Sequence, residues 1–127
     1  MPSDASIISD VPADSDWVAI TTELPTEIEV SVSPKSINRS SDNVVRAWIE
    51  YKYSRPRSFG SKFVKTLMVH NEYYCSERKY KILQSEAHFT DGTHERDFSE
   101  RQGYALADDP AFRYLCGMEK GSGMNRQ

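Results

Sequence analysis

Val-Val-Arg-Ala-Trp-Ile-Glu-Tyr-Lys-Tyr, residues 44–53, is rich in β-branched and aromatic side chains and lacks glycine and proline, so it predicts a β-strand. Side chains alternate between the two faces of a strand. One face holds Val45, Ala47, Ile49, Tyr51 and Tyr53, and the other holds Val44, Arg46, Trp48, Glu50 and Lys52. A strand with a tryptophan among its charged side chains is typical of a central position, with one face on the main core and the other partly covered.

Further β-rich segments on both sides of residues 44–53 predict partner strands. They are Asp16–Ile20, Glu27–Val32, Ile37–Arg39, Lys62–Cys75, Lys79–Phe89 and Thr93–Phe98. Within Lys62–Cys75, alternation places Phe63 on the face of Leu67, and Val64 on the opposite face. Ser54–Ser61 contains both proline and glycine, which predicts a hairpin loop longer than two residues.

The C-terminal part predicts a short helix. Asp109 is a good N-cap, Pro110 suits the first helical turn, and Gly117 is a natural helix stop. Phe112, Leu115 and Cys116 recur at helical spacing and would share the inner face of this helix. The predicted fold class is therefore α+β, an antiparallel sheet of about five to six strands with one short C-terminal helix packed on it.

Length and composition are those of a single soluble domain. The chain has 127 residues, of which 38% are hydrophobic and 28% charged. No apolar run approaches the roughly 18 residues that a membrane-spanning helix needs. Residues 1–15 are rich in Ser, Asp, Ala and Pro, and predict a disordered acidic leader. The expected organisation is this leader, a single domain over residues 16–117, and a flexible tail over residues 118–127.

Charge is distributed unevenly along the chain, whose net charge is −3. Residues 1–29 hold seven acidic side chains and no Lys or Arg, whereas residues 46–65 hold six basic side chains against Glu50 alone. The candidate partner-binding residues of this basic hairpin are Arg55, Arg57, Phe59, Lys62 and Lys65. Positive charge beside aromatic rings suits an acidic protein segment or a glycan. The alternative is that the charges protect an exposed edge from aggregation, and the acidic total disfavours nucleic acid.

The only two cysteines, Cys75 and Cys116, end a predicted strand and the predicted helix. They would meet if the helix lies across the sheet. A disulfide, two buried thiols, and a catalytic or metal-binding role all stay open on the sequence, although neither cysteine lies in a Cys-x-x-Cys motif.

Catalytic and metal-binding motifs give little support to an enzyme. His88 and His94 flank the predicted Asp91-Gly92 turn and could approach one another, but a third zinc ligand is not indicated. Glu95 and Asp97 would share a strand face, and no cleft around them can be inferred. The sequence has no nucleophile elbow and no phosphate-binding glycine loop. We therefore expect no catalytic residue, no metal and no cofactor.

Several segments, in this order and spacing, resemble the surface-adhesin protein E family of bacterial envelope proteins. They are Trp17–Ile20, Ser36–Arg39, Val45–Trp48, Tyr73–Leu83, Asp109-Pro110 and Leu115-Cys116, so the resemblance spans about residues 17–116. It implies an antiparallel sheet with a C-terminal helix tethered by a disulfide, here between Cys75 and Cys116, and often a homodimer. It also implies a non-enzymatic protein that binds host matrix and serum proteins.

The first residues, Met-Pro-Ser-Asp-Ala-Ser, form neither a basic nor an apolar export signal. The chain is thus either cytosolic or a mature protein whose signal has been removed, and the resemblance favours the periplasm or cell surface. Two alternative functions are a periplasmic immunity or inhibitor protein that blocks a toxin or hydrolase, and a structural subunit that contacts its own copy through an edge strand.

Overall fold

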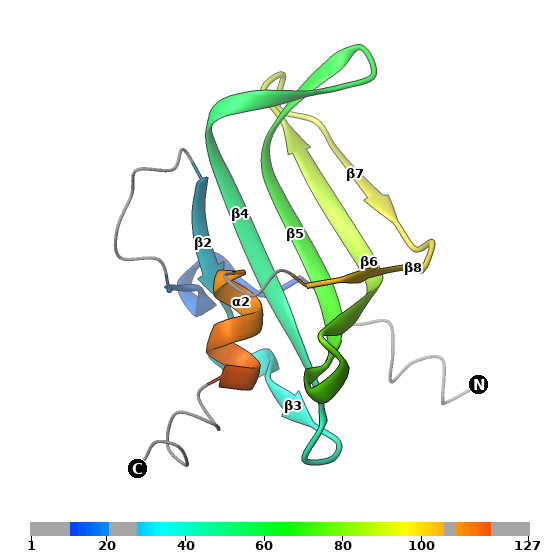
Figure 1. Cartoon of the computed structure of the whole chain (residues 1–127). Coiled ribbons are helices and arrows are strands. Elements are labelled where there is room, and N and C mark those ends of the chain that lie inside the picture. The colour runs from blue at the N-terminus through cyan, green and yellow to red at the C-terminus, as the bar shows by residue number, and fades with distance from the viewer. Residues whose placement is uncertain (1–10, 21–27, 106–108, 118–127) are drawn as a thin grey trace, which may run out of the picture.

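The computed structural model describes residues 11–20, 28–105 and 109–117 and shows one twisted antiparallel sheet with a helix across it (Figure 1). The strands are β1 (Val18–Ala19), β2 (Ile28–Val32), β3 (Asn38–Arg39), β4 (Val44–Phe59), β5 (Lys62–Tyr74), β6 (Lys79–Phe89), β7 (His94–Asp97) and β8 (Arg101–Tyr104). Their order is β1-β2-β4-β5-β6-β7, while β3 pairs with β4 and β8 pairs with β6. Three 3₁₀ turns, η1 (Asp14–Asp16), η2 (Pro34–Ser36) and η3 (Cys75–Glu77), lie between strands or ahead of them.

The predicted antiparallel sheet with a C-terminal helix is confirmed, but the fold is largely β and the described residues form eight strands instead of five to six. β8 is the strand with no pattern in the sequence, since it reads Arg-Gln-Gly-Tyr. It forms because β7 pairs only with Ser85–His88, which leaves Lys79–Ile82 of β6 to pair with β8. Pairing with β6 therefore makes Arg101–Tyr104 a strand although these residues have little intrinsic preference for one.

β4 occupies the predicted central position, between β2 and β5. Val45, Ala47 and Ile49 on one of its faces are fully buried in the main core, as the alternation predicts. On the opposite face Trp48 is also buried, and its ring stacks on His70 of β5 with centroids 5.0 Å apart. Both faces of the central strand are therefore covered along this stretch.

The predicted long loop at Ser54–Ser61 is wrong, because β4 continues to Phe59. Phe59 faces Lys62 across a turn of two residues, and Gly60 has the positive φ of 64° that a tight hairpin turn requires. Proline is tolerated within β4 because the register with β5 shifts between Lys52 and Arg57, so Pro56 lies outside the regular ladder. Figure 1 shows this end of β4 bending across the top of β5.

A second irregularity changes which side chains of β5 share a face. The register between β5 and β6 shifts between Val64 and Thr66. As a result Val64 packs with Leu67 and Phe89 in a small second core, whereas Phe63 is 54% exposed. The prediction from simple alternation is therefore wrong for Phe63 and Val64, since a bulge inserts one residue and inverts the faces beyond it.

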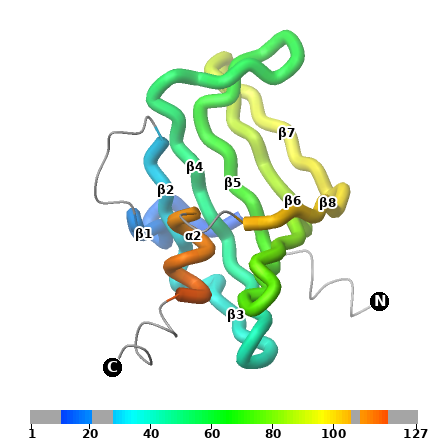
Figure 2. Tube along the Cα trace, in the orientation of Figure 1, coloured from blue at the N-terminus to red at the C-terminus, as the bar shows by residue number. Residues whose placement is uncertain are grey.

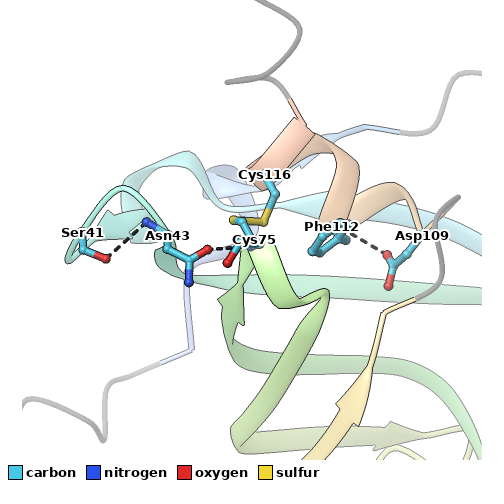
Figure 3. Close-up of a disulfide and its surroundings, with 7 residues drawn as sticks. Ser41, Asn43, Cys75, Asp109, Phe112 and Cys116 are labelled. Carbon is cyan, nitrogen blue, oxygen red and sulfur yellow. Dashed lines mark hydrogen bonds between the residues drawn. A yellow bond between two sulfur atoms is a disulfide. The ribbon is translucent and has the colours of Figure 1, made fainter. Parts of the chain in front are cut away.

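The closing helix and its disulfide have the predicted form. Pro110–Phe112 (α2) continues as a π-type turn, Arg113–Gly117, and Phe112, Leu115 and Cys116 are buried. The helix lies over β2 and β4 (Figure 2). Cys75 and Cys116 are joined by a disulfide with their Cα atoms 5.5 Å apart. Asn43 fixes the backbone around Cys75 (Figure 3). Its backbone carbonyl accepts a hydrogen bond from the Cys75 N–H, and its side-chain oxygen accepts one from the Ser76 N–H.

The predicted leader and tail fall largely on residues 1–10 and 118–127, which lie outside the described residues. The last two residues of the leader, Asp14 and Ser15, form the η1 turn together with Asp16. Within the described ranges, no helix is long and apolar enough to cross a membrane.

Candidate binding site

A groove of about 280 Å³ occupies the part of the core face that the helix leaves uncovered. Its floor is apolar and belongs to the central strands, with Leu67 and Val69 from β5 and Ile82 and Ala87 from β6. One wall comes from the β4–β5 hairpin, through Tyr53, Arg57, Ser58, Phe59 and Val64. The other comes from β7 and β8, through Glu95, Asp97, Ser99 and Arg101.

The hairpin wall combines cations with aromatic rings. The guanidinium of Arg57 lies 4.7 Å from the centre of the Tyr53 ring, and the Lys62 ammonium lies 5.0 Å from the centre of the Phe89 ring. Phe59 packs on Phe89 with centroids 6.0 Å apart, yet remains 55% exposed. An exposed aromatic ring among cations is typical of a surface that binds a partner.

The opposite wall carries carboxylates. Asp97 pairs with Arg101 at 2.7 Å, and hydrogen bonds from Ser99 hold the pKa of Asp97 below its ordinary value. Glu95 is exposed and lines the groove with Asp97, as expected for residues on one strand face. The groove is therefore positive on its hairpin side and mixed in charge on its β7–β8 side.

The five candidate residues of the basic hairpin do not all lie at the same site in the structure. Arg57 and Phe59 line the groove, and Lys62 lies beside it, where Asp91 and Thr93 hold its ammonium at 3.6 and 2.9 Å. Arg55 is exposed on the irregular part of β4. Lys65 lines a different cavity, on the opposite face of the sheet, beside the bulge of β5.

The β7–β8 wall was missed by sequence reasoning because its residues lie roughly 40 positions from the hairpin and β8 has no strand pattern. Asp97 and Arg101 form an ion pair in this wall, but their spacing of four residues indicates a contact only on a helix, so it gave no signal here.

His88 and His94 approach each other across the Asp91-Gly92 turn, with ring centroids 5.5 Å apart. His88 Nε2 and Arg96 Nε each lie 2.6 Å from a carboxylate oxygen of Glu86. The buried Glu86 carboxylate thus has two hydrogen-bond partners within the protein. Across the described ranges, no group of three or more His, Cys, Asp or Glu side chains is placed to hold a metal ion.

These features define a small antiparallel β protein with a disulfide-anchored helix and an apolar groove flanked by charged and aromatic side chains. The model of the surface-adhesin protein E family matches residues 17–103, and the chain belongs to that family. The family resemblance read from the sequence is thereby confirmed.

Two solved structures of Haemophilus influenzae protein E have a similar fold. Crystal form II is 9% identical, with a TM-score of 0.54 over 80% of this chain and 96% of that one. The selenomethionine form is 8% identical, with a TM-score of 0.54 over 87% of this chain and 90% of that one. At such identity the likeness concerns the fold alone. Comparison with curated proteins gives no match.

Proposed function

We propose that this protein is a non-enzymatic adhesin of the bacterial cell surface that binds a host extracellular-matrix protein through the groove and its hairpin wall. The observation that carries the proposal is the exposed Phe59 beside Arg57, at the mouth of an apolar groove. Membership of the surface-adhesin protein E family supports the surface location and the binding role.

The size and chemistry of the groove favour a protein partner. Its volume of about 280 Å³ is at or below the small end of the range for small-molecule pockets, roughly 300–1,000 Å³. It therefore suits one or two apolar side chains of a partner, which would insert between the hairpin and β7. Aromatic residues and arginine are the side chains most enriched in protein interfaces and their energetic centres.

The positive charge of the hairpin indicates that the partner segment is acidic. Arg55 and Arg57 lie on the hairpin side, and Arg57 is positioned by its contact with Tyr53. A partner segment with an acidic residue next to its apolar anchor would pair with these cations while the anchor fills the groove. Lys65 is left out of this surface because it lines the opposite face.

A double substitution, Arg55→Glu with Arg57→Glu, tests the proposal. We expect it to weaken binding to immobilised matrix proteins such as fibronectin and collagen by tenfold or more, about 1.4 kcal/mol, in surface plasmon resonance. The matched control is Lys35→Glu with Arg113→Glu, which makes the same charge change at exposed positions outside the groove and its walls and should leave the affinity unchanged.

Equal affinity in the hairpin variant and the control would remove the groove from the binding surface. Capture of one bacterial enzyme at tight one-to-one stoichiometry, without matrix binding, would instead support the inhibitor function and overturn the adhesin proposal.

A further inference from the structure

The opposite face of the sheet holds a second, larger cavity of about 590 Å³. It lies between the N-terminal segment, which contributes Asp14 and Trp17, and strands β2, β4, β5 and β6. We infer that this cavity binds a small dipolar molecule that carries both an ammonium group and a carboxylate. The inference is independent of the proposed function, since the two cavities lie on different faces.

The charges that line this cavity are sorted by position. The acidic side chains are Asp14 from η1, Glu29 from β2 and Glu50 from β4, whereas Lys52 and Lys65 come from β4 and β5, with the His88 imidazole beyond them on β6. The pairing register explains the order, because Glu29, Lys52, Thr66 and His88 are successive neighbours in one cross-strand row. The cavity is therefore acidic at β2, carries both signs at β4 through Glu50 and Lys52, and is basic at β5 and β6.

Glu50 is the strongest indication of a ligand. The residue is only 6% exposed and lines the cavity, and no described residue forms a hydrogen bond or ion pair with its carboxylate. Burial raises the pKa of Glu50, and the nearby Asp14 and Glu29 carboxylates add to the rise, against the opposing effect of Lys52. A buried carboxylate without a partner is costly, so a ligand ammonium that donates to it would relieve that cost.

Trp17 gives the acidic side an aromatic wall. An ammonium group gains from contact with the face of an indole as well as from neighbouring carboxylates. The volume lies within the usual range for small-molecule sites. A simple amine would leave Lys52 and Lys65 without an anionic partner. A ligand that also carries a carboxylate would pair with these lysines, so the inference specifies both groups.

A series of ω-amino acids, namely glycine, 4-aminobutyrate and 6-aminohexanoate, tests the inference by isothermal titration calorimetry with the full chain. The series separates the two charges by increasing distance. We expect at least one member to bind with a Kd of about 1 mM or tighter, and about tenfold more tightly than hexylamine or hexanoate, which carry one charge each. Failure of all three amino acids to bind, or equal binding of hexylamine, would overturn the inference.

Two variants locate the site. Glu50→Gln and Lys65→Gln should each weaken binding of the best probe about tenfold, whereas Glu95→Gln, in the groove on the other face, should leave it unchanged. Glu50→Gln keeps the shape of the side chain and Lys65 is exposed, so we expect both variants to fold, which thermal melting checks. Undiminished binding in Glu50→Gln would place the probe elsewhere. Probe binding by a native protein that does not bind matrix proteins would count against the proposed function alone.

Discussion

Glu50 and Glu86 lie in one cross-strand row, with Met68 between them, and their carboxylates meet opposite environments. Both residues are buried. Burial would raise the pKa of Glu86 too, but hydrogen bonds with His88 and Arg96 hold it below its ordinary value. Glu50 has no such donors, and burial keeps its pKa raised. One buried carboxylate is compensated within the protein, and the other is not.

Replacing Glu50 by Gln should therefore stabilise the protein at neutral pH. The charged carboxylate is disfavoured in the folded state, and this penalty is fully present above the raised folded pKa and disappears as the pH falls below the ordinary value of 4.5. We expect Glu50→Gln to melt at a higher temperature than the native protein at pH 7, and the difference to vanish near pH 4. A lower melting temperature at pH 7 would show that the charge is compensated.

Arg96 should matter more than Arg101, although each forms one close ion pair. Arg96 Nε lies 2.6 Å from the buried Glu86, whereas Arg101, whose side chain is 65% exposed, pairs at 2.7 Å with the partly exposed Asp97. Arg96→Met leaves a buried carboxylate with one donor fewer and should lower the free energy of unfolding by about 1–2 kcal/mol. Arg101→Met, the matched control, should lower it by less than about 0.5 kcal/mol. Urea denaturation measures both, and equal losses would contradict this account.

At the scale of elements, the helix depends on its N-cap residue, Asp109. Asp109 Oδ1 accepts a hydrogen bond from the Ala111 N–H group at 2.9 Å. It accepts a second from the Phe112 N–H group at 3.3 Å (Figure 3). Asp109→Ala should cost about 1 kcal/mol of unfolding free energy, because these N–H groups lose their acceptor. Asp109→Asn retains a capping oxygen and should cost much less in the same urea titration. Equal effects of Ala and Asn would show that the cap does not stabilise the helix.

The sequence predicted those strands and the helix whose ends are marked by their own residues or by residues next to them. β6 was predicted to the residue as Lys79–Phe89, because its alternation is bounded by turn residues on both sides. The helix was predicted from Asp109, Pro110 and Gly117. The hairpin was predicted with too long a loop because proline was taken to end a strand, whereas here it lies at a register shift.

The candidate site was less predictable than the fold for a related reason. Arg57 and Phe59 could be singled out, since charge and aromatic rings are visible locally. The other wall of the groove depends on β8 pairing with β6, which no local pattern indicates. Lys65 was grouped with Arg57, but the bulge of β5 places it at a cavity on the opposite face, and bulges have no dependable sequence signal.

For the whole molecule, the disulfide is the main covalent constraint. It joins residues separated by 41 positions, which in the chain-entropy model stabilises the folded state by roughly 4 kcal/mol. That is a large share of the 5–15 kcal/mol typical of a domain. Cys75→Ser with Cys116→Ser should lose about this amount in urea denaturation, and the reduced native protein should match the variant. A loss below about 1 kcal/mol would show that packing of Leu115 and Phe112 alone anchors the helix.

The same bond closes residues 75–116 into a covalent ring that contains β6, β7, β8 and the helix. A protease that cuts any single peptide bond inside this ring opens it but releases no fragment. Both walls of the groove would stay on one molecule after such a cut, and the nicked chain would separate into two bands on a gel only after reduction. This architecture therefore tolerates a first cleavage between residues 75 and 116 without losing either wall of the groove.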